Sequence, residues 1–216
     1  MNSAAANQDS MVFITYNLRP GSEAAGYDDW LREFDNPTFN KTPGIVRYQN
    51  WKVADGSGEG LPFTHFDLLQ IDGPDSLEQV WFDEPLEKFR AIWVEKWGNY
   101  STVGPAKVNT LAYLSSRIVK SGRPRAANLV FVGGDADPVA LDTGFDTWRL
   151  DELVRKHWAL GYAKPGEAWR MALSTGHHLG FEHFHLKFID NASEFDDAQS
   201  AISKRAGTVF LGELIA

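Results

Sequence analysis

The feature of this sequence that most constrains its fold is an internal repeat. When the chain is shifted by 118 positions, residues 11–72 align with residues 129–190 without a gap, and 16 of the 62 pairs are identical. About four identities are expected by chance at ordinary residue frequencies. The identical pairs include two of tryptophan, Trp30 with Trp148 and Trp51 with Trp169. A duplicated unit explains this pattern better than a coincidence of composition does.

Both copies contain the same order of expected elements, strand–helix–strand–strand–helix–strand. For the first copy, the patterns predict strands over 11–18, 45–53, 63–71 and 108–118, and helices over 23–34 and 76–97. For the second copy, they predict strands over 129–132, 168–175, 181–189 and 208–215, and helices over 145–158 and from 193. We therefore expect a disordered leader over residues 1–10, repeats over 11–118 and 128–216, and a linker over 119–127.

Each βαββαβ unit follows the ferredoxin-like plan, in which two helices cover one face of a four-stranded antiparallel sheet. The other face of each sheet must also be buried, and the second copy supplies the simplest partner. The sequence therefore predicts an α+β fold in which two tandem ferredoxin-like repeats pack sheet to sheet as an α+β barrel.

Composition excludes several classes of function. The formal charge of −8 disfavours nucleic acid and anionic membrane surfaces as partners. The absence of cysteine excludes disulfides, thiolate catalysis and iron–sulfur clusters. No apolar run is long enough to span a bilayer, and residues 1–10 lack the features of a signal peptide. We expect a cytoplasmic protein, and the sequence leaves open whether it is a monomer or a homodimer.

Three segments resemble a known family. They are MVFITYNLRPG at 11–21, TPGIVRYQNW at 42–51 and THFDLLQID at 64–72. Together with the doubled βαββαβ order, they make the chain similar to the dimeric α+β-barrel superfamily in a tandem form, and within it to the RedY/HapK-like proteins of pigment and alkaloid biosynthesis. The resemblance implies a cofactor-independent cyclase of secondary metabolism, such as antibiotic biosynthesis, and the superfamily also includes small monooxygenases and haem enzymes.

Strand alternation sorts the chemistry-bearing residues onto one face of the third strand in each copy. His65 and Asp67 share that face in the first copy, and His183 and His185 share it in the second. The opposite face is uniformly apolar and suits the helices. We therefore expect the four ionisable groups to point into the barrel and to converge on one cavity.

Such a cluster favours general acid–base catalysis, because an imidazole with a pKa of about 6.5 can take and return a proton near neutral pH. In this hypothesis His65 and His183 move protons, while Asp67 and His185 orient the imidazole rings or polarise the substrate. The alternative interpretation is that the histidines are core residues. The expected substrate is a small, conjugated, largely apolar molecule bound by Tyr16, Trp51, Trp169 and His178.

Two other functions fit the same residues. His-x-Asp and His-x-His are ligand-like spacings, so a haem- or metal-dependent oxygenase is the second hypothesis, although no His-Glu-x-x-His motif accompanies them. The third is a protein that binds an aromatic metabolite without changing it. The first hypothesis, which requires neither metal nor cofactor, is the one that we carry forward.

Overall fold

A closed antiparallel barrel dominates the computed structural model, which describes residues 9–81, 83–98, 111–134, 144–150, 158–159, 181–191, 193–202 and 208–216. Eight strands form the closed ring in the order β1-β3-β2-β9-β5-β8-β6-β4, and β4 pairs again with β1. The ring strands are β1 (Ser10–Tyr16), β2 (Ile45–Val53), β3 (His65–Ile71), β4 (Leu111–Val119), β5 (Asn128–Gly133), β6 (Asp146–Leu150), β8 (His183–Ile189) and β9 (Thr208–Leu214). The two-residue strand β7 (Trp158–Ala159) adds to β4 outside the ring.

The same strand order occurs in both halves of the ring. The first half reads β4-β1-β3-β2 and the second reads β9-β5-β8-β6, so in each half the first strand lies between the fourth and the third. The register follows the offset of 118 as well, since Thr15 pairs with Phe66 and Gly133 pairs with Phe184. The pairs β2–β9 and β4–β6 join the halves and close the barrel.

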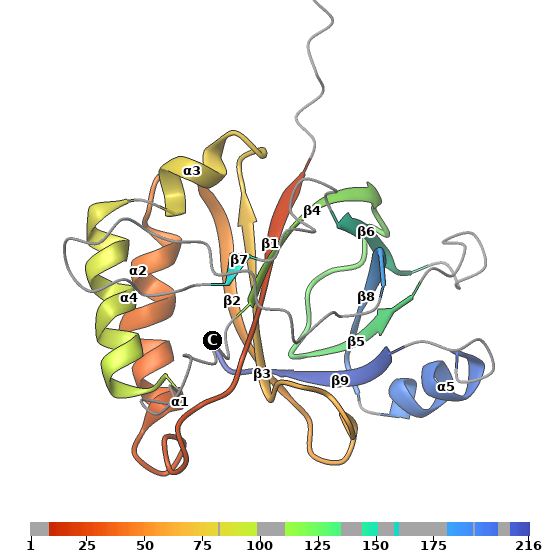
Figure 1. The fold of residues 1–216 in the computed structure, drawn as a ribbon. Helices are drawn as coiled ribbons and strands as arrows, with labels where there is room; N and C mark the ends of the chain where they lie inside the picture. The colour runs from red at the N-terminus through yellow and green to blue at the C-terminus, as the bar shows by residue number, and fades with distance from the viewer. Residues whose placement is uncertain are drawn as a thin grey trace, which may run out of the picture.

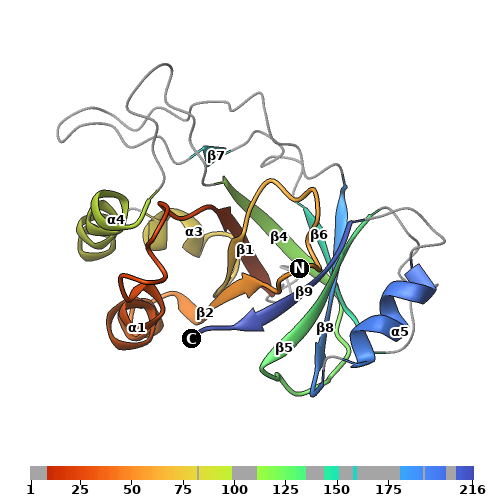
Figure 2. The same ribbon diagram turned by 90° about the horizontal axis from the view of Figure 1, so that it is seen from below.

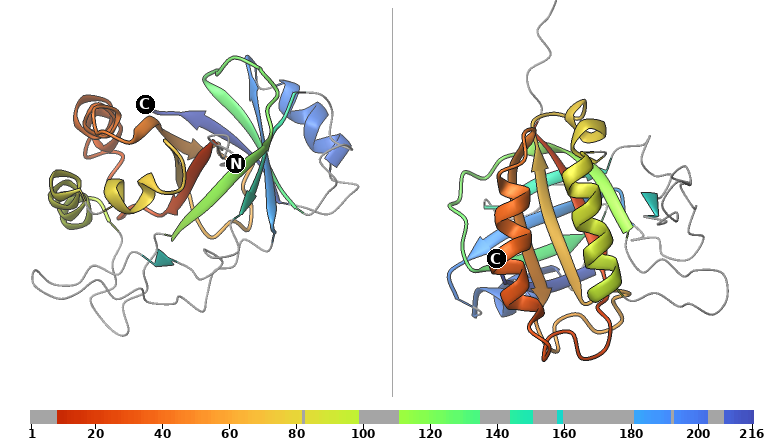
Figure 3. Two further views of the ribbon diagram at one scale, coloured as in Figure 1. Left: turned by 90° about the horizontal axis from the view of Figure 1, so that it is seen from above. Right: turned by 90° about the vertical axis from the view of Figure 1, so that its left-hand side faces the viewer.

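Helices cover the outside of the ring on two opposite sides (Figures 1 and 2). Over the first half, α1 (Tyr27–Trp30), η1 (Leu31–Asp35) and α2 (Asn36–Asn40) form one continuous rod beside α4 (Glu84–Lys96), as Figure 3 shows. The short α3 (Ser76–Trp81) precedes α4, and Asp83 caps α4 by accepting a hydrogen bond from the Leu86 amide. Over the second half, α5 (Ser193–Ile202) is the helix among the described residues.

Aromatic and aliphatic side chains fill the barrel interior. Phe131 stacks on Phe13 with a centroid distance of 5.1 Å and on Phe210 at 4.5 Å. The interior cluster consists of Met11, Phe13, Trp51, Phe63, Phe66, Leu68, Tyr113, Leu129, Phe131, Trp148, Leu150, Phe181, Phe184, Leu186, Phe188 and Phe210. Eight strands enclose a space that side chains alone can fill, so the interior here is a packed core.

The expected orientation of the third strands is therefore wrong. Phe66, Leu68 and Phe184 point into the barrel, whereas His65 and Asp67 lie on the outer face of β3, beneath the helices. The reason is that the interior of a closed barrel excludes water more completely than a helical layer does, so the more uniformly apolar face of each strand turns inward.

The helix expected over residues 145–158 is also wrong, because Asp146–Leu150 forms strand β6 between β8 and β4. Trp148 pairs with Phe184 as Trp51 pairs with Phe66, and each indole stacks on its phenylalanine at an interplanar angle of 8°. Trp148 thus occupies the position of Trp51, not that of Trp30. The expected strand over 168–175, with Trp169, lies outside the described residues.

Replacing Trp148 with alanine should lower the free energy of unfolding as much as replacing Trp51 does, by about 3–5 kcal/mol, since both leave a large cavity in the barrel. Urea unfolding of the two variants tests this. Phe34→Ala is the control, because Phe34 is 54% exposed and its loss should cost about 1 kcal/mol or less. A cost for Trp148→Ala as small as that of the control would contradict the placement of β6.

Candidate active site

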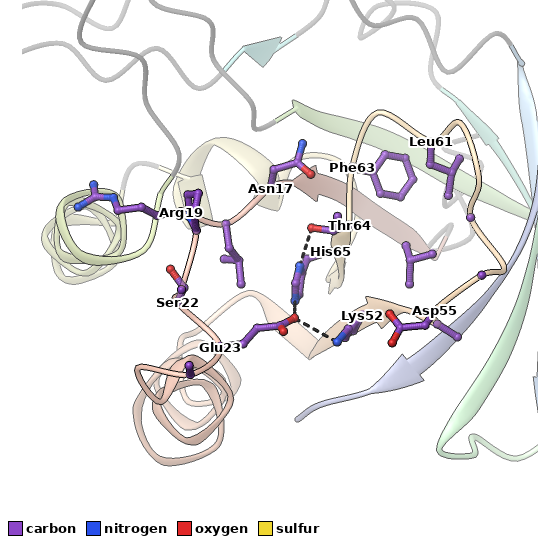
Figure 4. A pocket seen from close by; sticks show the side chains of 18 of the residues that line it. Asn17, Arg19, Ser22, Glu23, Lys52, Asp55, Leu61, Phe63, Thr64 and His65 are labelled. Atoms are coloured by element: carbon purple, nitrogen blue, oxygen red, sulfur yellow. Dashed lines mark hydrogen bonds and ion pairs between the residues drawn. The ribbon is translucent and has the colours of Figure 1, made fainter.

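A pocket of about 860 Å³ opens beside the first half of the barrel. It lies between the segment that follows β1 and the loop that joins β2 to β3 (Figure 4). Apolar side chains such as Leu18, Leu61 and Phe63 supply part of its lining, and polar and charged side chains supply another part. Its size and mixed lining suit a small organic molecule.

His65, at the start of β3, is the residue of the expected site that reaches this pocket. Its ring is 2% exposed, stacks on the Tyr16 ring at 5.6 Å and meets the edge of the Tyr27 ring at 5.8 Å. Nδ1 shares a hydrogen bond of 2.9 Å with the Thr64 hydroxyl, while Nε2 has no hydrogen-bond partner. The ring is thus held from three sides, and one nitrogen is left for chemistry.

Glu23 and Lys52 complete the charged part of the pocket. Glu23 Oε1 lies 3.7 Å from His65 Nε2 and 3.1 Å from Lys52 Nζ (Figure 4). Sequence reasoning missed both residues, because Glu23 comes from a turn and Lys52 from a strand with no motif around it. The available signal was that Lys52 and His65 are neighbours across the predicted hairpin, where side chains on one face meet.

Burial lowers the pKa of His65 to about 4, although the Glu23 carboxylate opposes this effect and the Lys52 ammonium adds to it. The imidazole is therefore neutral at neutral pH and able to accept a proton. Glu23 stands where it would stabilise the resulting imidazolium.

Beneath His65, a buried hydrogen-bond network surrounds Asp67. Its carboxylate accepts hydrogen bonds from the Tyr16 hydroxyl at 3.0 Å, the Tyr48 hydroxyl at 2.8 Å and Asn50 Nδ2 at 3.0 Å. The Tyr27 hydroxyl donates to that of Tyr16, so the network continues into α1. Asp67 therefore binds these donors and not His65, which differs from the ring-orienting role expected for it.

A second buried carboxylate, that of Asp35, joins the network through Asn50, whose Nδ2 also lies 3.1 Å from Asp35 Oδ2. Asp35 comes from η1, a single π-helical turn, and such turns are frequent at functional sites. Burial raises the pKa of Asp67 to about 7 against the opposing effect of its three hydrogen bonds. The pKa of Asp35 is raised as well, by burial and by the negative charge of Asp67.

The histidines of the second half do not converge with His65. His183 and His185 lie on the outer face of β8, and the filled barrel separates that face from β3. His185 is fully buried, shares a hydrogen bond of 2.9 Å with the Thr147 hydroxyl, and has a pKa lowered to about 4 by burial and by His183. The expectation of one shared chamber is thus wrong, because the two third strands turn their polar faces in opposite directions.

The expected substrate-binding residues are dispersed. Tyr16 belongs to the network and stacks on His65, whereas Trp51 lies inside the packed barrel. Trp169 and His178 lie outside the described residues.

Within the described ranges, the structure contains no group of three or more His, Asp and Glu side chains arranged to hold a metal ion. In the same part of the chain, no helix is both long enough and apolar enough to cross a membrane.

Comparison with known proteins agrees with the resemblance inferred from the sequence. Residues 10–103, which run from β1 through α4 and contain the pocket, match the family model described as REDY-like protein HapK. The first half of the chain is therefore similar to this family. No curated protein matches the sequence.

Solved structures with a similar fold include three proteins of low sequence identity. One is a candidate chlorite dismutase, with a TM-score of 0.52, 11% identity and coverage of 97% of this chain and 95% of the other. An anthrone oxidase-like protein has a TM-score of 0.52 and 8% identity, with coverage of 100% and 94%. A candidate monooxygenase from Fusobacterium nucleatum subsp. nucleatum has a TM-score of 0.50 and 9% identity, with coverage of 97% and 93%. These likenesses confirm the fold.

The His65 imidazole should titrate near pH 4 because its burial disfavours the charged form. Histidine side-chain NMR spectra recorded between pH 3 and 8, with His65→Gln to assign the signal, measure this directly. A midpoint between pH 6 and 7 would mean that the ring is solvated and would contradict the buried site.

Asp67 should make the protein less stable as the pH rises. Its folded-state pKa of about 7 exceeds the value of about 3.9 for an unfolded chain, so proton binding favours the folded state. This contribution is complete below about pH 4 and is lost as the pH rises through 7, at up to about 1.4 kcal/mol per pH unit. Unfolding free energies of the wild type and Asp67→Asn, measured from pH 4 to 8, should therefore diverge with this slope. Parallel curves would show that Asp67 is ionised throughout.

Proposed function

We propose that this chain is an enzyme of secondary metabolism that moves protons on a small, conjugated, largely apolar molecule bound in the pocket beside β3. The reaction class that we favour is a cofactor-independent cyclisation or aromatic-ring formation. The observation that carries the proposal is the geometry of His65, a buried neutral imidazole that lines the pocket and whose Nε2 has no hydrogen-bond partner and lies 3.7 Å from Glu23 Oε1.

In the proposed reaction, His65 acts as a general base. Its Nε2 takes a proton from an acidic carbon of the substrate, and Glu23 stabilises the imidazolium that forms. The rings of Tyr16 and Tyr27 keep the imidazole in place, and the apolar pocket wall excludes water from the substrate. Returning the proton to a different atom of the substrate completes an isomerisation or sets up ring closure.

A second reaction class begins with the same deprotonation. Two proteins of similar fold are an anthrone oxidase-like protein and a candidate monooxygenase. A carbanion formed by His65 could react with molecular oxygen instead of with a carbonyl group of the same molecule. The two classes therefore share the base and differ in what the carbanion attacks.

We also propose that the two halves are tandem ferredoxin-like repeats, residues 11–118 and 128–216 joined by residues 119–127. The equal strand orders and the shared register offset support a duplication. In this proposal the first repeat keeps the catalytic pocket, while the second completes the barrel. The charge of −8 supports a small-molecule substrate over a nucleic acid.

Anthrone, a tricyclic ketone with an acidic CH₂ group, provides the test. In anaerobic D₂O buffer the protein should speed exchange of deuterium into that group, measured by NMR above the buffer rate. His65→Gln should lower the enzymatic rate by about 100-fold or more, while His183→Gln, on the far side of the barrel, should leave it unchanged. Exchange that survives His65→Gln would refute the assignment of the base, and binding without any exchange would indicate a carrier protein.

The same probe separates the two reaction classes. In air, an oxygenase converts anthrone and O₂ to anthraquinone and water, which mass spectrometry detects. Exchange without enzymatic anthraquinone formation supports the cyclase class, and anthraquinone formation that depends on His65 supports the oxygenase class.

A further inference from the structure

A cation stands beside the proposed base. Lys52 on β2 is the direct partner of His65 in the antiparallel register, so both side chains leave the sheet on the same helix-covered face. The Lys52 side chain is 30% exposed and lines the pocket. The other basic residue of the lining, Arg19, directs its guanidinium to the Gly98 carbonyl oxygen, away from His65 (Figure 4). Lys52 is therefore the cation that a molecule next to His65 would meet.

One carboxylate oxygen atom of Glu23 lies between the Lys52 ammonium and the His65 imidazole, which shows that a negatively charged atom fits there. Glu23 Oε1 is within 3.1 Å of the Lys52 ammonium and 3.7 Å of His65 Nε2. Glu23 belongs to the turn between β1 and α1 and is half exposed, so the carboxylate can share this place with a substrate atom at little cost. Its hydrogen bond also raises the pKa of Lys52, which keeps the ammonium charged.

We propose that Lys52 is a catalytic residue that holds the carbonyl oxygen of the substrate, and that the pocket therefore selects enolisable ketones. Glu23 is a positioning residue that orients the Lys52 ammonium toward His65. This inference rests on the proposed function, because it names the residue that stabilises the oxyanion formed when His65 removes the proton.

The proposed step balances without an oxidant or a cofactor. His65 Nε2 takes the proton from the acidic carbon, which is next to the carbonyl group in a simple ketone and conjugated with it through the aromatic ring in anthrone. The electron pair of the broken C–H bond then forms the C=C bond of the enolate, directly in a simple ketone and through the ring in anthrone. The carbonyl π electrons move to oxygen, which becomes an anion held by the Lys52 ammonium. A neutral ketone and a neutral imidazole thus give an enolate and an imidazolium, and return of the proton from the imidazolium to the substrate makes both groups neutral again.

Binding of two fluorescent anthracenes tests the selectivity. The wild type should bind 9-anthracenecarboxylate, whose oxyanion stands in for the enolate oxygen, at least about 10-fold more tightly than neutral 9-anthracenemethanol. Lys52→Met should remove this preference, while Lys52→Arg, which keeps the charge, should retain most of it. Equal preference in the wild type and Lys52→Met would overturn the inference.

Deuterium exchange into anthrone tests whether Lys52 takes part in the deprotonation. Lys52→Met should lower the exchange rate by about 100-fold, and Lys52→Arg should restore part of it. If His65→Gln abolishes exchange but Lys52→Met does not change it, the inference about Lys52 fails and the proposed function stands. If His65→Gln leaves exchange intact, the proposed function itself fails.

Glu23→Gln distinguishes positioning from simple stability. Loss of the carboxylate should lower the NMR titration midpoint of His65 below its wild-type value, because Glu23 raises the pKa of that imidazole. The exchange rate should fall along with it. An unchanged midpoint and an unchanged rate would show that Glu23 forms only a surface ion pair.

Discussion

Closure of the barrel is the constraint on which the rest of the structure depends. The β2–β9 and β4–β6 pairs join two four-stranded sheets edge to edge. This leaves an interior that holds sixteen buried apolar side chains from the part of the chain that the structure describes. Such an interior cannot accept an ionisable group without a large desolvation cost. The polar face of each third strand must therefore turn outward. In the first half it meets the helical layer, and the pocket forms at the edge of that layer.

The helical layer over the first half supports two polar environments with different roles. At its open end, His65, Glu23 and Lys52 meet the pocket and can exchange protons with a bound molecule. Deeper in the layer, Asp67 and Asp35 have no basic partner among the residues bonded to them, and neutral hydroxyl and amide donors satisfy them instead. The raised pKa values of both carboxyls follow from this arrangement. The deep network holds Tyr16 in place, and the Tyr16 ring in turn supports the face of His65.

The sequence predicts the fold well and the site in part. Alternation and the repeat locate seven of the eight ring strands, because β-branched and aromatic runs bounded by glycine and proline survive in both copies. The repeat fails at Trp148, where an ungapped alignment pairs a strand residue with a helical one, since packing against Phe184 decides its conformation and sequence offset does not. His65 is found from its spacing. The surroundings of His65 could not be predicted. Alternation separates the two faces of a strand but does not show which face a second sheet will cover, and Glu23 reaches the pocket only through the turn before α1.

The central claim is that the substrate binds in the pocket beside β3, at the edge of the helical layer of the first half, and not inside the barrel. Intermolecular NOEs from bound 9-anthracenecarboxylate test it most directly. We predict contacts from the anthracene protons to the His65 ring and to the Leu18 and Lys52 side chains. Contacts to Phe131 and Phe210, which face only the barrel interior, would contradict the account.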